Sequence, residues 1–235
     1  MFQIRLINSS CSHLIISLEY FFLKVNVWKE RETMDYNNGM KKTIRIVLNA
    51  FLAVMVIIQW VILATGIPDS SFMSGGLRTL RYFTVLSNLL EAAACIIWIL
   101  TGNEKLKYVG AVSVGLTFTV VMVFLGPLFG YLMMFTGASL WMHGIVPLAA
   151  MAEMIICNRQ KITVGDNIWA VFPMFIYGIF YLGNIIINGI PGNDWYGFML
   201  WGYPGGAAAL VIIICVTYGI GLVLRKLNEK VGVGK

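Results

Sequence analysis

Three ionisable side chains, Glu91, His143 and Glu153, lie inside long apolar stretches of this sequence. Charged side chains are costly in the interior of a membrane and usually face the inside of a helix bundle, where they serve a function. Each of the three is therefore a candidate functional residue. We expect neither a metal nor another cofactor, because a lone histidine cannot assemble a zinc site and neither HExxH nor a Cys/His cluster is present.

Thr84, Asn88 and Glu91 are spaced at i, i+4 and i+7, which places them on one face of a helix. A hydroxyl beside an imidazole is the minimum for nucleophilic catalysis, since the hydroxyl is a weak nucleophile until a base takes its proton. Thr84 and His143 could form such a dyad. Thr84 lies near the N-terminus of its helix, where unpaired N–H groups favour an oxyanion, and Asn88 or Arg81 could add a side-chain donor.

Other interpretations of these side chains stay open. Thr in a membrane helix usually bonds the carbonyl four residues earlier, and Asn often ties two helices together. Glu91, His143 and Glu153 could instead form the relay of a small proton-linked transporter, although His143 and Glu153 lie about 80° apart on an ideal helix. In a third interpretation, a non-catalytic membrane scaffold, the small-residue runs 92–94 and 205–209 pack helices together.

The elements that must position these side chains follow from composition. Of 235 residues, 59% are hydrophobic and only 12% are charged, and the mean hydropathy is +0.80. A soluble domain carries about 25% charged residues, so a water-facing surface is excluded. Within lipid every backbone amide must be paired inside its own segment, which favours α-helices of about 20 residues. We predict an all-α bundle of six transmembrane helices over about 44–67, 82–100, 108–129, 140–157, 168–188 and 201–224.

The distribution of Lys and Arg predicts the orientation. With residues 1–39 set aside, eleven basic residues lie on the side of the termini and only Arg78 and Arg81 lie on the other. Basic loops stay in the cytoplasm, so both termini are expected there, in a multi-pass protein of the cell membrane. The net charge of +6 is spread thinly, which does not indicate a nucleic-acid partner. Membrane lipids are the expected partners.

Thr84 and His143 both lie near the outer ends of their predicted helices. Further polar groups gather at the same level, in the outer loops and at the outer end of the fifth span. We expect several side chains to face a substrate, either from this level or from the helix face that carries Thr84. They are Arg78, Glu91, Asn184, Asn193 and Asp194.

Residues 1–39 do not follow this pattern. Their apolar stretch, 14–23, is too short for a membrane span, carries Glu19 and is followed by no small-residue cleavage site. We interpret 1–39 as a poorly ordered extension or a wrongly assigned start, and 40–235 as a single membrane domain. The four cysteines show neither CxxC nor clustered spacing and are interpreted as small hydrophobic residues without a disulfide framework.

Three stretches together resemble a known family. Residues 81–88 (RYFTVLSN), residues 141–147 (WMHGIVP) and the aromatic segments 188–198 and 201–203 are similar to bacterial six-span membrane proteins. That family is related to the androgen-induced and androgen-dependent TFPI-regulating proteins of animals. The likeness covers roughly 43–225.

The resemblance implies an intramembrane threonine hydrolase. The animal members cleave fatty acid esters of hydroxy fatty acids with one Thr and one His. Matched by motif, these roles fall on Thr84 as nucleophile and His143 as general base. The outer loop departs from the bacterial pattern, because it keeps Pro191 but lacks most of the other prolines.

Overall fold

The computed structural model describes residues 38–66 and 75–231, and every regular element in these ranges is a helix. The predicted all-α class is thus confirmed. The interpretation of residues 1–39 falls outside the described residues, except for the last two. The chain divides into two units between Ile44 and Arg45, and the packing reported below belongs to the second unit.

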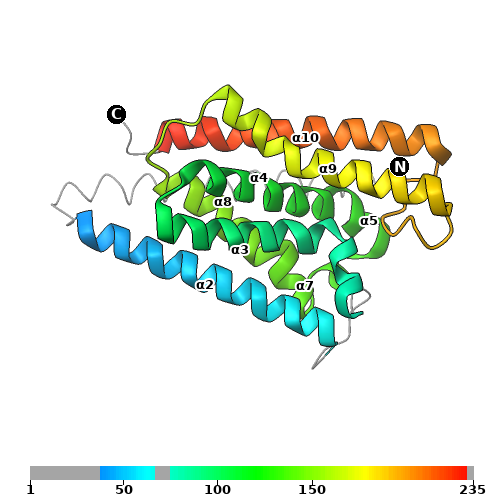
Figure 1. The fold of residues 1–235 in the computed structure, drawn as a ribbon, viewed down its shortest axis with the longest axis horizontal. Coiled ribbons are helices and arrows are strands. Elements are labelled where there is room, and N and C mark those ends of the chain that lie inside the picture. The colour runs from blue at the N-terminus through cyan, green and yellow to red at the C-terminus, as the bar shows by residue number, and fades with distance from the viewer. Residues whose placement is uncertain (1–37, 67–74, 232–235) are drawn as a thin grey trace, which may run out of the picture. The chain divides into compact units, whose positions relative to one another are not determined.

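Six stretches of the described residues are long and apolar enough to cross a membrane, as predicted (Figure 1). Four of them are single helices: α2 (Asn38–Thr65), α3 (Phe83–Thr101), α9 (Val164–Asn188) and α10 (Gly202–Val231). The third span joins α4 (Glu104–Val120), η2 (Val121–Leu125) and α5 (Gly126–Phe129). The fourth joins α7 (Gly137–Leu140), η3 (Trp141–Ile145) and α8 (Val146–Cys157). Two short helices, η1 (Gly76–Arg81) and α6 (Tyr131–Met134), lie between spans.

A two-residue turn joins α3 to α4. Gly102 ends α3 in the left-handed conformation, with φ 71°, and its N–H donates to the Trp98 carbonyl. Asn103 then begins α4, because its side chain accepts the Leu106 N–H at 3.0 Å. The helix therefore starts four residues before the apolar run at 108, and it brings Lys107 into the span.

Both broken spans contain a π-helical turn two residues before a proline. The Gly126 N–H bonds the Val121 carbonyl before Pro127, and the Val146 N–H bonds the Trp141 carbonyl before Pro147. A proline lacks the N–H that would continue the helix, and its ring displaces the carbonyl four residues earlier. The wider turn accommodates that displacement, and it changes the direction in which later side chains point.

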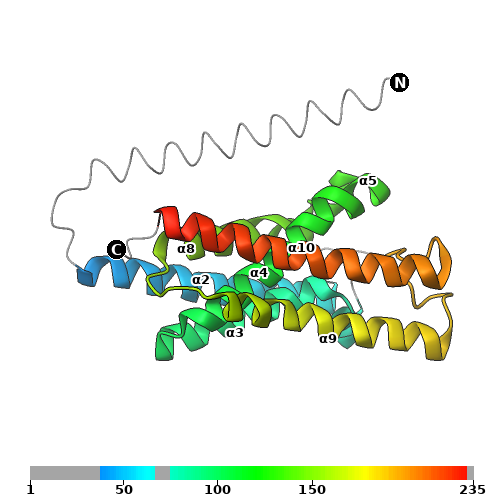
Figure 2. The same cartoon turned by 90° about the horizontal axis from the view of Figure 1, so that it is seen from above.

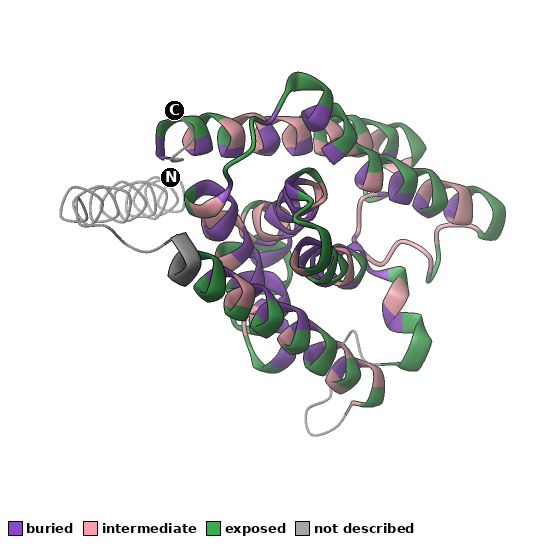
Figure 3. Cartoon of the chain, turned by 60° about the vertical axis from the view of Figure 1, so that its left-hand side comes forward, coloured by how far each residue is buried: buried purple, intermediate pink, exposed green. Residues whose placement is uncertain are grey.

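α4 is the central helix of the bundle, in contact with α3, α8, α9 and α10 (Figures 1 and 2). Gly110 lets α3 approach closely, because a Cβ there would lie 3.1 Å from the Glu91 Cα and 3.2 Å from the Ala94 Cβ. Figure 3 shows the buried residues on the inward faces of the helices. The bundle is thus built around a tightly packed α3–α4 pair.

The outward faces of the bundle are apolar. Exposed large hydrophobic residues on α2, α9 and α10 include Ile57, Phe180, Ile187, Val211, Ile212 and Val223. In water such a large exposed apolar surface would drive association. Facing lipid, it needs no cover, in agreement with six membrane spans.

Replacing Gly110 with Ala should destabilise the bundle by about 1–3 kcal/mol, because the added methyl group overpacks the α3–α4 contact. Reversible unfolding in mixed micelles measures the effect. Gly183→Ala is the matched control, since a Cβ at Gly183 meets nothing within 4 Å and Ala is the better helix former. Equal stability of the two variants would contradict the close packing of α3 on α4.

Candidate functional site

The N-terminus of α3 is capped by a side chain distant in sequence. Tyr82, the residue before the helix, provides no side-chain cap, and the Tyr196 hydroxyl accepts the Phe83 N–H at 2.7 Å instead. The first N–H groups of a helix have no partner within it and attract partial negative charge. Tyr196 therefore occupies the position at which the sequence predicts an oxyanion to bind.

Tyr196 lies in the segment between α9 and α10, and it is 7% exposed. Burial raises the pKa of its phenol to about 12, against the opposing effect of hydrogen bonding with Tyr177 and with the start of α3. The hydroxyl consequently keeps its proton at physiological pH. It is a hydrogen-bond donor as well as an acceptor beside Thr84.

Asp194 folds the segment that carries Tyr196. Its carboxylate accepts the Phe198 N–H at 3.0 Å, the Met199 N–H at 2.8 Å and the Tyr181 hydroxyl. Ring contacts then link this segment to α9 and to the start of α3, through Tyr82, Tyr177, Tyr181, Trp195, Tyr196 and Phe198. Asp194 therefore has a structural role, because its oxygens are engaged in folding the loop, and its role as a substrate-facing group stays a prediction.

Two asparagines predicted to face a substrate also hold the same loop together. Asn184 donates to the Asn193 side chain at 3.2 Å. Asn193 in turn donates to the Gly189 carbonyl at 2.9 Å and approaches two neighbouring carbonyls at 3.3 Å. Neither residue lines the cavity described next.

A small cavity lies among α3, α4, α9, α10 and the Tyr196 segment. Its volume is about 30 Å³, which is room for one or two water molecules. Most of its wall is apolar, and its polar lining residues are Thr84, Thr117, Tyr177 and Tyr196. Of the residues predicted to form the site, Thr84 lines this cavity, and it is 4% exposed.

Asn88 ties α3 to the fourth span. Its amide nitrogen donates to the Thr84 carbonyl at 2.7 Å and to the Met142 carbonyl at 2.9 Å. Both amide hydrogens are therefore used, and none remains for an oxyanion in this conformation. The Asn88 oxygen is buried without a hydrogen-bond partner.

His143 lies in the π-helical turn η3, next to Met142, and is 1% exposed. Its Nδ1 lies 2.8 Å from the Met134 carbonyl oxygen. A carbonyl only accepts, so Nδ1 carries the proton and Nε2 of the neutral ring is left as the basic atom. Among the described residues no hydrogen bond joins His143 to Thr84. The segments that carry them are joined instead by the hydrogen bond from Asn88 to the Met142 carbonyl.

The two arginines of η1 lie outside the cavity lining. Arg81 is exposed, donates to the Tyr82 hydroxyl at 2.6 Å and places its guanidinium over the rings of Tyr82 and Trp195 at 4.8 Å and 5.4 Å. Arg78 is exposed one turn earlier. Both positions suit contact with an anionic group at the membrane surface.

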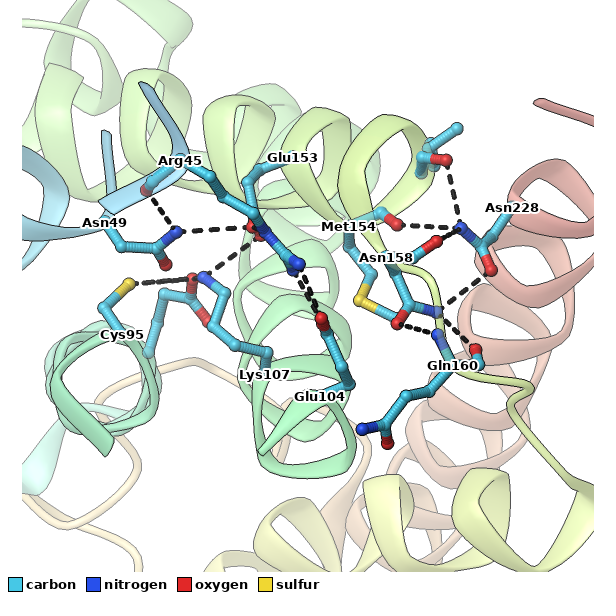
Figure 4. Close-up of polar contacts among 12 residues, drawn as sticks. Arg45, Asn49, Cys95, Glu104, Lys107, Glu153, Met154, Asn158, Gln160 and Asn228 are labelled. Atoms are coloured by element: carbon cyan, nitrogen blue, oxygen red, sulfur yellow. Dashed lines mark hydrogen bonds and ion pairs between the residues drawn. The ribbon is translucent and has the colours of Figure 1, made fainter. Parts of the chain in front are cut away.

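Glu91 and Glu153 belong to a second polar region, the buried charge cluster formed by Arg45, Glu91, Glu104, Lys107 and Glu153 (Figure 4). Arg45 of α2 donates to both oxygens of Glu104, at 2.5 Å and 2.6 Å, and also to Glu153. Lys107 pairs with Glu91 and lies 3.4 Å from Glu153. Glu91 thus faces a lysine rather than the cavity at Thr84.

The relay proposed for a transporter is only partly assembled. Glu91 and Glu153 share Lys107, whereas His143 bonds the Met134 carbonyl. Among the described residues, no group of three or more His, Cys, Asp or Glu side chains is placed to hold a metal ion.

The sequence pattern did not identify Arg45, Glu104 and Lys107 as interior residues, nor Tyr196 as a helix cap. Arg45 and Lys107 flank apolar runs and were counted with the loop charges; without them nine basic residues remain on the side of the termini, so the predicted orientation is unchanged. One feature of the sequence does indicate that Lys107 is an interior residue. A glutamate inside a span requires a cationic partner, and Lys107 follows Glu91 across a short turn.

Comparison of this chain with protein-family models, with curated proteins and with solved structures finds no match.

Replacing Asp194 with Ala should lower stability by about 2 kcal/mol, because three donors lose their acceptor. The aromatic loop, which is the segment 189–201 between α9 and α10, should also become a chymotrypsin cleavage site in detergent micelles. Glu229→Ala is the control, since Glu229 is 57% exposed and forms only a surface pair with Arg225. A loop that resists the protease equally in both variants would argue against the folding role of Asp194.

Proposed function

We propose that this protein hydrolyses lipid esters within the membrane, with Thr84 as the nucleophile and His143 as the general base. The observation that carries the proposal is the position of Thr84, a buried residue that lines a small cavity at the N-terminus of a membrane helix. The resemblance of residues 81–88 and 141–147 to the intramembrane threonine hydrolases supports the same assignment.

The chemistry follows from the groups around Thr84. The Thr84 oxygen attacks the ester carbonyl while Nε2 of His143 takes its proton, and the proton is then returned to the leaving alcohol. Water cleaves the acyl-enzyme in a second, equivalent step, which releases the fatty acid and restores Thr84. Nδ1 of His143 keeps its hydrogen bond to Met134 throughout, so the ring stays oriented.

The developing oxyanion is stabilised at the start of α3. The Phe83 N–H there is bonded to the Tyr196 hydroxyl, which keeps its proton because of its high pKa. Tyr196 is therefore the donor that we assign to the oxyanion, in place of Asn88, whose hydrogens are engaged. Arg81 and Arg78 bind the carboxylate or phosphate of the substrate at the surface.

Two parts of the site, the cavity wall and the Thr84–His143 pair, must move before the reaction. The cavity of about 30 Å³ is large enough for water but not for an acyl chain, so the substrate must displace side chains of its wall. The Thr84 hydroxyl and the His143 ring also need to meet, and catalytic hydrogen bonds commonly tighten only in the substrate complex. Asn88 links the two segments through the backbone carbonyls of Thr84 and Met142, so it does not engage the Thr84 hydroxyl or Nε2 of His143.

The purified protein should hydrolyse a fluorogenic medium-chain ester and react with a fluorophosphonate probe. Thr84→Ala should abolish labelling, and His143→Gln should lower the hydrolysis rate by about 10²–10⁴-fold, because the general base is lost. Thr119→Ala is the matched control: its hydroxyl bonds the Gly115 carbonyl on α4 and does not line the cavity. Undiminished labelling of Thr84→Ala, or an inert wild-type protein, would refute the assignment.

We also propose that both termini are cytoplasmic, so that the Thr84 cavity opens toward the outer leaflet. Cysteines introduced at Pro191 and Lys161, both exposed, test this orientation. In intact cells a membrane-impermeant maleimide should label Pro191→Cys above the wild-type background and leave Lys161→Cys unlabelled until the cells are opened. The reverse pattern would invert the topology.

A further inference from the structure

The buried charge cluster carries an unequal number of charges. Arg45 and Lys107 supply two positive charges, and Glu91, Glu104 and Glu153 supply three negative ones if all are ionised. None of these five side chains is more than 8% exposed. An unpaired charge in such a site is strongly destabilising, so the cluster calls for one further positive charge.

The hydrogen bonds of the cluster show the same deficit. Within the cluster the unpartnered atoms are Oε2 of Glu91 and Oε2 of Glu153, although the latter lies 3.4 Å from the Lys107 ammonium. Beside it, Oδ1 of Asn49 and the N–H of Trp98, whose ring lies against Arg45, are also unpartnered. The Asn49 amide points into the cluster, where its Nδ2 donates to Glu153 at 3.3 Å (Figure 4). Buried oxygens without a donor indicate that a hydrogen, rather than an anion, completes the site.

The pairing of each carboxylate identifies where that hydrogen belongs. Glu104 receives both ends of the Arg45 guanidinium, the strongest arrangement for an ionised carboxylate. Glu153 receives Arg45 and Asn49 on one oxygen and faces Lys107 with the other. Both are therefore held in the ionised form.

Glu91 is the least compensated of the three. Lys107 and the Cys95 thiol contact its Oε1, and its Oε2 has no hydrogen-bond partner although the side chain is fully buried. The charged or titratable groups that face Glu91 are Lys107, Glu153 and Cys95. Oε2 of Glu91 lies directly against Gly110, and a Cβ added to Gly110 would clash with it. This narrow space favours a proton on Oε2 over a larger cation.

We propose that the buried charge cluster binds one exchangeable proton, carried by the Glu91 carboxyl. With that proton the five side chains sum to zero charge, and the packed core of α2, α3, α4 and α8 contains no unpaired charge. The folded protein then holds a proton that the unfolded chain releases at neutral pH. Stability consequently falls as the pH rises, tenfold in the unfolding equilibrium constant for each pH unit over which one proton is released.

Substitution by glutamine separates the three carboxylates, because glutamine has the shape of a protonated glutamate. Glu91→Gln should keep wild-type stability at neutral pH and lose the one-proton dependence on pH. The matched controls Glu104→Gln and Glu153→Gln remove an ionised partner of Arg45, and they should shift the unfolding equilibrium constant by 100-fold or more. A Glu91→Gln variant that misfolds, or is as unstable as the controls, would overturn the proposal.

Infrared spectroscopy of the wild-type protein provides a readout that needs no stable variant. At pH 7 the full-length protein in micelles should show the C=O band of a protonated carboxylic acid, shifted in deuterium oxide and missing in Glu91→Gln. Absence of the band in the wild type would refute a bound proton. Stabilisation by sodium chloride at constant pH, compared with equal choline chloride, would show instead that the site binds a metal cation.

Discussion

Burying five ionisable side chains in a membrane is the constraint on which the rest of this structure depends. Every charge among them needs a partner of opposite sign, and the partners come from four helices, α2, α3, α4 and α8. The positions of these helices are thereby fixed. α9 and α10 contribute nothing to the cluster. They are attached by hydrogen bonds such as Tyr108 to Asn167 at 2.6 Å and Asn158 to Asn228 at 3.0 Å, and α9 also by the ion pair of Asp166 with Lys105 at 2.9 Å. The cavity at Thr84 lies where α9 and α10 meet α3 and α4.

The loop between α9 and α10 matters both for the folding of this end of the bundle and for the surroundings of Thr84. Asp194 shapes the loop, and the loop delivers the Tyr196 hydroxyl to the first N–H of α3. Thr84 follows that N–H by one residue. The folding of this loop therefore also places a hydroxyl group beside Thr84, although Phe83 and Tyr196 are more than a hundred positions apart in the sequence.

Apolar runs were sufficient to predict the six spans, and the helical spacing of Thr84 correctly placed it on an interior face. The polar partners could not be predicted in the same way. Lys107 was assigned to a loop because hydropathy does not show that Asn103 already begins the helix. Tyr196 reaches α3 through tertiary packing alone. Asn184, Asn193 and Asp194 share the level of the cavity but turn toward their own loop, a choice that depends on hydrogen bonds rather than on depth.

The π-helical turns η2 and η3 interrupt the register of the third and fourth spans. One extra residue in a turn rotates everything beyond it by about 100°, so the two halves no longer share a common face. In the fourth span, His143 belongs to one half and Glu153 to the other. Substitutions in α7 therefore need not disturb the ion pairs of Glu153 in α8, so the part of the span before η3 can change in sequence while the charged core stays the same.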